Sequence, residues 1–206
     1  MSGGVQEAVL ILGAVASLAF LVGSTIDGLT RSSYSVIRHP VSALALGSRG
    51  WLQNLSFVLC GALIATGGAG VWSTSWLLAS GVIVLGLGLL ASGIYPMDPA
   101  RGYPPGTPEG DPPSPSQHHV RHDQAGAVVF FTMPVLPLVA ALTAALPIPF
   151  RWASAAVAVA VAVGVGAFSK AWEAESPRAG LVQRLALAGG LGWLAALLLV
   201  VAAETR

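Results

Sequence analysis

Two polar stretches between long apolar runs contain every histidine of this sequence. The four are His39, His118, His119 and His122. Asp27 precedes the first stretch, and Asp98 precedes the second. Imidazole and carboxyl groups exchange protons near neutral pH when their surroundings shift their pKa values. These residues are therefore the candidates for catalysis, provided that the fold brings them together.

The composition indicates that lipid faces most of the surface. Hydrophobic residues make up 54% of the 206 residues, charged residues make up only 9%, and the mean hydropathy is +0.74. A soluble domain usually carries about 25% charged residues. The net charge is +1 and no basic patch interleaved with aromatic residues is present, so nucleic acid is not an expected partner. Membrane lipid is the expected one.

Six apolar runs are long enough to cross a hydrocarbon core of about 30 Å, which needs roughly 20 helical residues. They are residues 8–27, 52–71, 76–95, 124–146, 152–169 and 184–203. Main-chain groups in lipid must pair within their own segment, so each run is predicted to be a helix. We expect one all-α domain over residues 1–206, a six-transmembrane-helix bundle. A proline-rich connection, loop 3, covers about 96–122.

Successive spans cross in opposite directions, so the first, third and fifth connections must share one face of the membrane. This face would collect Asp27, His39, Asp98 and His122. We expect Asp98 and His122 to form an acid–base pair, with His39 as a second proton carrier or orienting group. Asp27 is a further candidate carboxyl group.

Polar side chains near the first connection are candidates for substrate binding. Asn54 and Gln53 begin the second span, and Ser42 precedes them in the first connection. Arg38 or Arg49 would hold an anionic head group, because the forked donors of arginine suit phosphate. A plainer alternative is that both arginines only anchor this segment at the membrane surface.

The segment "HPVSALALG", residues 39–47, predicts a short interfacial helix within the first connection. Pro40 suits the first turn of a helix and Gly47 suits its end. Val41 and Leu44 would share one face. That face would lie on the membrane or be tucked into the mouth of the bundle.

The sequence does not require a metal or another cofactor. His118 and His122 are four residues apart and would share a helix face, so with His39 they form an alternative zinc set. Solvated histidines, or acid–base use without a metal, explain the same residues. The motifs HExxH and Gly-x-Ser-x-Gly are missing, and the single cysteine excludes an intramolecular cysteine pair.

The blocks "RHPVSALALGSRGWLQNLSFVLCGAL", "YPMDP" and "RHDQAG" resemble a family of bacterial and archaeal membrane proteins catalogued as domain of unknown function 998. The resemblance covers about residues 8–203 and implies a six-span bundle. It implies no established activity. The positions that match the family pattern are His39, Pro40, Ser42, Gly50, Asn54, Asp98 and His122.

Three classes of function remain open. The first is a membrane enzyme that acts on a lipid-soluble substrate, either an isoprenoid or an acyl lipid. The second is a non-catalytic structural or partner-binding subunit, including a homo-oligomer, because small residues such as "GGAG" favour helix association. The third is a proton-coupled transporter, which needs polar groups through the bilayer centre. The third, fifth and sixth spans offer little beyond Ser80, Ser92, Ser154 and Ser169.

The distribution of basic residues predicts the orientation in the cell membrane. Eight of the ten lysines and arginines lie in or beside the first, third and fifth connections. The positive-inside rule therefore places these connections in the cytoplasm and both termini outside.

Cysteine accessibility tests this orientation. In a Cys60→Ser background, we expect Ser114→Cys in loop 3 to react with a membrane-impermeant maleimide only after the cells are permeabilised. Ser73→Cys in the second connection is the matched control and should react in intact cells. The opposite pattern would invert the topology.

Overall fold

The computed structural model describes residues 2–205, and these residues contain six long α-helices. The helices are α1 (Gly3–Leu29), α2 (Gly50–Gly70), α3 (Trp76–Ile94), α4 (Gln117–Leu142), α5 (Ile148–Glu173) and α6 (Ala179–Ala203). Each is long and apolar enough to cross a membrane. The predicted all-α, six-span architecture of a multi-pass membrane protein is confirmed.

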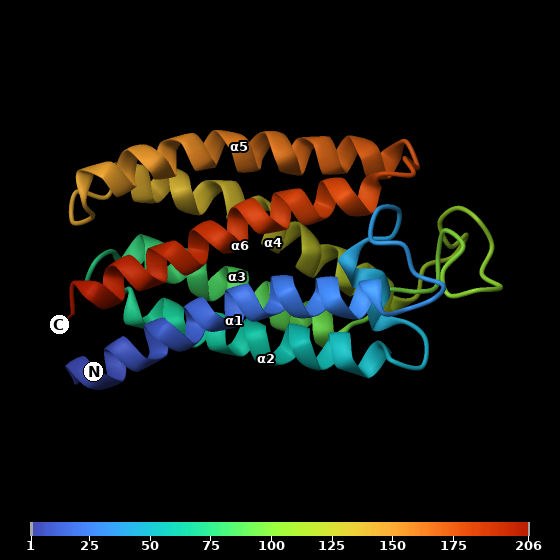
Figure 1. Ribbon diagram of the computed structural model, residues 1–206, viewed down its shortest axis with the longest axis horizontal. Coiled ribbons are helices and arrows are strands. Elements are labelled where there is room, and N and C mark those ends of the chain that lie inside the picture. The colour runs from blue at the N-terminus through green and yellow to red at the C-terminus, as the bar shows by residue number, and fades with distance from the viewer. Residues whose placement is uncertain (1, 206) are drawn as a thin grey trace.

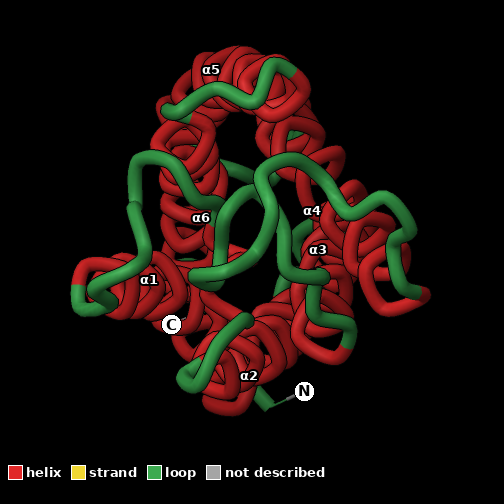
Figure 2. Tube along the Cα trace, turned by 90° about the vertical axis from the view of Figure 1, so that its right-hand side faces the viewer, coloured by secondary structure: helices red, strands yellow, loops and turns green. Residues whose placement is uncertain are grey.

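The helices form a ring in which each packs against the next along the chain and α6 packs back against α1 (Figure 2). Both termini lie at one end of the bundle (Figure 1). Loop 1 (residues 30–49), the observed loop 3 (residues 95–116) and loop 5 (residues 174–178) lie at the opposite end, which we call the loop end. All four histidines are at this end, as the alternating direction of the spans predicts.

Helix α4 begins seven residues earlier than the apolar run suggests. Its first residue is Gln117, and the preceding Ser116 caps the helix because its hydroxyl oxygen accepts the N–H of His119 at 3.1 Å. Serine is a favoured residue at this position. The histidines expected in loop 3 are therefore in the first two turns of α4, where a helical face fixes their directions.

Loop 1 contains the predicted short helix, a 3₁₀ helix named η1 (Val41–Ala45). Leu44 is fully buried and Val41 is 2% exposed, so η1 is tucked into the mouth of the bundle and does not lie on the membrane surface. The start of α6 passes so close to loop 1 that a Cβ atom on Gly180 would lie 2.3 Å from the carbonyl oxygen of His39. Only glycine permits this approach.

We expect Gly180→Ala to separate α6 from loop 1 and to destabilise the protein by about 1–3 kcal/mol, as other overpacked sites do. The measurement is the thermal unfolding midpoint in detergent. Gly192→Ala is the matched control, because it adds the same methyl group to the same helix where no atom lies within 4 Å. Equal midpoints for the two variants would contradict the close contact.

Candidate functional site

Loop 1 is bound to α6 by Arg184, which has oxygen atoms as partners in the loop. Its guanidinium group donates to the carbonyl oxygens of Val36 at 2.9 Å and His39 at 3.0 Å, and to the hydroxyl of Tyr34 at 2.7 Å. Burial raises the pKa of Tyr34 to about 12 against the opposing effect of Arg184. The phenol therefore stays protonated and donates to the carbonyl of Pro40 at 2.7 Å. These bonds satisfy polar main-chain groups in a buried, largely non-helical segment.

Gln183, the neighbour of Arg184, makes a second connection. Its side-chain oxygen accepts the N–H of Val41 at 2.7 Å, and the residue is only 4% exposed. Because the oxygen is used, the NH₂ group of this amide is the part available to a bound molecule. Sequence reasoning missed Gln183, because a single polar residue next to an apolar span usually lies in the solvated end of the helix.

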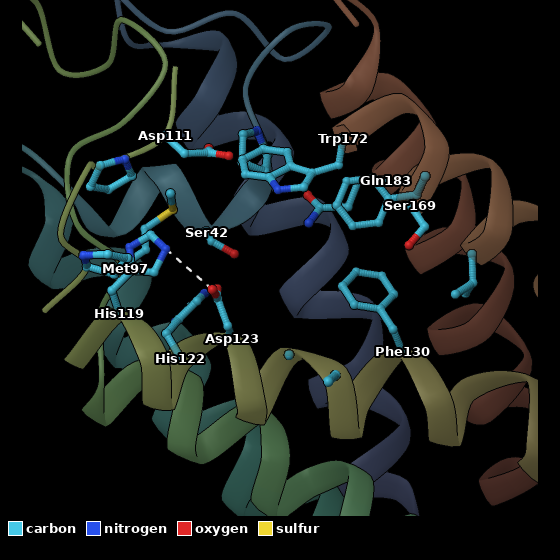
Figure 3. A pocket seen from close by; sticks show the side chains of 17 residues that line it. Ser42, Met97, Asp111, His119, His122, Asp123, Phe130, Ser169, Trp172 and Gln183 are labelled. Atoms are coloured by element: carbon cyan, nitrogen blue, oxygen red, sulfur yellow. Dashed lines mark ion pairs between the residues drawn. The ribbon is translucent and has the colours of Figure 1, made fainter. Parts of the chain in front are cut away.

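A cavity of about 440 Å³ lies at the loop end, between α4, α5 and α6 (Figure 3). Helices α4 and α5 lie together near the end that carries the termini and diverge toward the loop end (Figure 1). The rings of Phe130 and Phe168, 5.1 Å apart, are part of its wall, and Trp172 and Met97 add further apolar surface. This volume is in the range that small-molecule sites usually have.

His122 lines this cavity and is only 6% exposed. Its Nδ1 atom lies 2.8 Å from the carbonyl oxygen of Tyr95 and 3.1 Å from that of Ser92. Both partners are acceptors, so Nδ1 carries the proton and Nε2 keeps its lone pair. The ring is thus fixed as a base that can accept a proton from a molecule in the cavity.

His119 lies one helical turn before Asp123 and interacts with it. Its Nδ1 atom accepts the main-chain N–H of Asp98 at 2.9 Å, which leaves the proton on Nε2. Nε2 lies 3.4 Å from the carboxylate of Asp123 (dashed in Figure 3). Both side chains line the cavity. They provide a second group through which a proton can move.

Asp98 binds Ser116, the residue that caps α4. Its carboxylate accepts two hydrogen bonds from Ser116, one from the main-chain N–H and one from the hydroxyl, each 2.7 Å long. Burial alone would raise the pKa of Asp98, but these two bonds and the nearby His119 lower it. Asp98 therefore binds Ser116 and His122 binds main-chain carbonyls, so the two side chains expected to form an acid–base pair have different partners. The residues that line the cavity do not include Asp98.

Asp27 and Arg49 belong to an ion-pair cluster that joins the end of α1 to the start of α2. The carboxylate of Asp27 binds Arg31 at 2.6 Å and Arg49 at 2.5 Å. Arg31 also donates to the carbonyl oxygen of Leu46 at 3.0 Å, and its side chain is 6% exposed. This cluster fixes the two ends of loop 1 and lies outside the wall of the cavity.

His39 and Arg38 are not among the residues that line this cavity. Nδ1 of His39 accepts the N–H of Ser35 at 3.0 Å, and its ring packs against Tyr34 and Tyr103. Burial, and then the positive charge of Arg38, lower the pKa of His39, which favours the neutral ring. Arg38 pairs with Glu109 of loop 3. Of the residues expected to bind substrate, Ser42 alone lines the cavity.

Gln53 and Asn54 lie inside the bundle at the start of α2. Gln53 is 2% exposed. Its Nε2 atom and the Oδ1 atom of Asn54 are buried without a hydrogen-bond partner in residues 2–205. Neither residue is part of the cavity wall, so the structure gives no direct route from them to a molecule bound there.

The alternative zinc set is spread over three surroundings. His39 packs among tyrosines and His122 binds main-chain carbonyls, whereas the ring of His118 packs against Tyr95 at 5.6 Å. In the part of the chain that the structure describes, no group of three His, Cys, Asp or Glu side chains is placed to hold a metal ion.

Loop 3 covers the cavity at the loop end through Arg101. Its guanidinium group makes two hydrogen bonds to Asp111, at 2.7 and 2.8 Å, and lies 3.5 Å from the centre of the Trp172 ring. It also donates to the carbonyl of Trp172 at 2.7 Å. The bonds from Arg101 lower the pKa of Asp111. This contact holds Asp111 and Trp172, which sequence reasoning did not single out, on the cavity wall.

A family described as "Protein of unknown function (DUF998)" matches residues 14–200. The chain belongs to this family. No curated protein and no solved structure matches it. The match to DUF998 contains the whole cavity wall, from Pro40 to Gln183, and confirms the resemblance to this family.

The lowered pKa of Asp98 predicts acid sensitivity of the helix cap. A carboxyl group whose pKa is lower in the folded state stabilises fully above its unfolded pKa, and this contribution disappears as the pH falls through the folded value. We expect Asp98→Asn to lower the thermal midpoint at pH 7 and to flatten its decline below about pH 5.

Ser116→Ala removes one of the two donors and should give an intermediate slope. The thermal midpoint measured across pH for the three proteins checks this order. Parallel curves for wild type and Asp98→Asn would contradict the assignment of Asp98 as an ionised partner of Ser116.

Proposed function

We propose that this member of DUF998 is a small integral membrane enzyme that uses His122 as a general base on a lipid-soluble substrate. The observation that carries the proposal is the state of His122. Two main-chain carbonyls hold its Nδ1 proton, and the ring lines an otherwise largely apolar cavity. A histidine needed only for packing does not have to line an open space, as His122 does.

The position of the cavity supports an amphipathic substrate. The cavity is at the end of the spans, and its wall includes both buried residues and residues on the outer surface, such as Asp123 and Ala127. The apolar part of a lipid would pack against Phe130 and Phe168. Its polar part would then be beside His122 and the His119–Asp123 pair.

In this proposal Asp98 is a positioning residue. Its main-chain N–H fixes the proton of His119 on Nε2, facing Asp123, and its carboxylate holds the first turn of α4. Asp27, His39, Arg38 and Arg49 support loop 1. We further propose that the loop end faces the cytoplasm, since eight of the ten basic residues are at this end.

Lipid analysis of the His122→Ala variant tests the enzyme proposal. Extracts from cells that express wild type, or from vesicles of native lipids that contain the purified protein, are compared by mass spectrometry. A general base contributes about 10²–10⁴-fold to a rate. We therefore expect a lipid species converted by wild type to be converted at least about 100-fold more slowly by the variant.

His118→Ala is the matched control, because His118 lies one turn before His122 on the same helix but does not line the cavity. It should behave as wild type. Identical lipid profiles for wild type, His122→Ala and empty membranes would reject the enzyme and leave a structural subunit as the explanation.

A further inference from the structure

A second, smaller cavity of about 40 Å³ continues from the main cavity into the bundle, and we call it the inner chamber. Phe20, Phe57 and Leu89 form part of its wall. Its volume is enough for a water molecule or for one small group of a substrate. The residues that line both spaces form the junction between them, and they are Ser42, His122, Gly126, Phe130 and Gln183.

Three of these junction residues carry reactive or hydrogen-bonding groups, and they come from three separate elements. Ser42 of η1 supplies a hydroxyl, His122 of α4 supplies the Nε2 lone pair, and Gln183 of α6 supplies an amide NH₂. Figure 3 shows the three side chains around one space. A hydroxyl, a neutral imidazole and an NH donor are the set that nucleophilic acyl transfer needs.

The surroundings hold each member of this set in place. The bond from Val41 N–H to Gln183 joins α6 to the residue that precedes Ser42, at 2.7 Å. Ser92, which also lines the inner chamber, differs from Ser42 because its hydroxyl donates to the carbonyl of Gly88 at 3.0 Å within its own helix. Ser42 therefore supplies the hydroxyl at the junction, and the hydrogen bond from Val41 to Gln183 of α6 holds the segment that carries it.

The charged residues of the cavity wall favour one of the two classes of lipid substrate. An isoprenoid diphosphate needs cations, and arginine or lysine is the usual partner of phosphate. The residues that line the main cavity include neither, whereas two carboxylates, Asp111 and Asp123, are among them. An uncharged acyl ester fits this wall better than an anionic lipid does.

We propose that Ser42 is the nucleophile with which the enzyme proposed above cleaves an uncharged acyl ester lipid. The Ser42 oxygen bonds to the acyl carbon while its proton moves to Nε2 of His122. The NH₂ group of Gln183 donates to the carbonyl oxygen, which becomes negative. The bond to the alcohol then breaks, and the leaving oxygen takes the proton from His122.

Water completes the cycle. It attacks the acyl-Ser42 ester and gives a proton to His122, which returns it to the Ser42 oxygen as the fatty acid leaves. Atoms and charges balance, and the only co-reactant is water from the membrane surface beside the exposed Asp123.

A long-chain alkyl fluorophosphonate tests the proposal, since it forms a stable bond to an activated serine with loss of fluoride. The full chain in detergent is treated with the probe and analysed by intact mass and peptide mapping. We expect one adduct, on Ser42, and none in Ser42→Ala. His122→Ala should slow the labelling at least about 100-fold.

Gln183→Glu keeps the oxygen that accepts Val41 N–H and removes the NH₂ donors. Loss of one oxyanion donor typically costs about 10²–10³-fold in rate. We expect a loss of this size in hydrolysis of a long-chain umbelliferyl ester. Ser92→Ala and Ser169→Ala are the controls, because both serines line one of the two spaces, and they should keep wild-type labelling. Thermal midpoints establish that each variant folds.

The outcomes separate the two proposals. The absence of an adduct on folded wild type, or an adduct that persists in Ser42→Ala, overturns the nucleophile. A lipid conversion that requires His122 but continues in Ser42→Ala also overturns it, and leaves the membrane enzyme intact. Equal rates for Gln183→Glu and wild type would remove Gln183 from the mechanism and contradict the proposed set.

Discussion

The attachment of loop 1 to α6 is the contact on which the other features of the loop end depend. A largely non-helical segment can be buried in the end of a membrane bundle only if its main-chain polar groups find partners. Arg184 supplies them for the carbonyls of Val36 and His39, Gln183 supplies one for Val41, and Gly180 gives the close approach. These contacts join α6 to the part of the cavity wall that carries Ser42.

This requirement explains why so apolar a chain concentrates its charges at one end. The arginines of loop 1 have structural partners: Arg31 and Arg49 bind Asp27, and Arg38 binds Glu109. Of these groups the side chains of Arg31 and Asp27 are largely buried, and a buried charge is costly unless it is paired. The cavity wall, in contrast, has imidazole, hydroxyl, amide and carboxylate groups. Charge thus organises the loop end, and largely neutral groups are left facing the cavity.

The second determinant is the divergence of α4 from α5. Figure 1 shows that α4 and α5 diverge toward the loop end, and Phe130 and Phe168 contact each other on the wall of the cavity at that end. The extension of α4 to Gln117 places His119, His122 and Asp123 on helical turns at this opening. Residues three and four apart on a helix are neighbours. The same turns therefore present a base and a second proton-transfer pair to one space.

The sequence by itself determined the six spans, their alternating direction and the position of all four histidines at one end of the bundle. The reason is that the length of an apolar run is a local property of the sequence, and this length decides whether the run can cross the bilayer. It also indicated His122 and Ser42. It did not indicate their hydrogen-bond partners. Only the tertiary structure shows that the carbonyls of Ser92 and Tyr95 hold His122. The same is true of the bonds from Ser116 to Asp98 and from Val41 to Gln183. Hydrogen bonds between residues far apart in sequence depend on how the helices pack. When the packed faces are apolar, the spacing of residues in the sequence does not show which helices are neighbours.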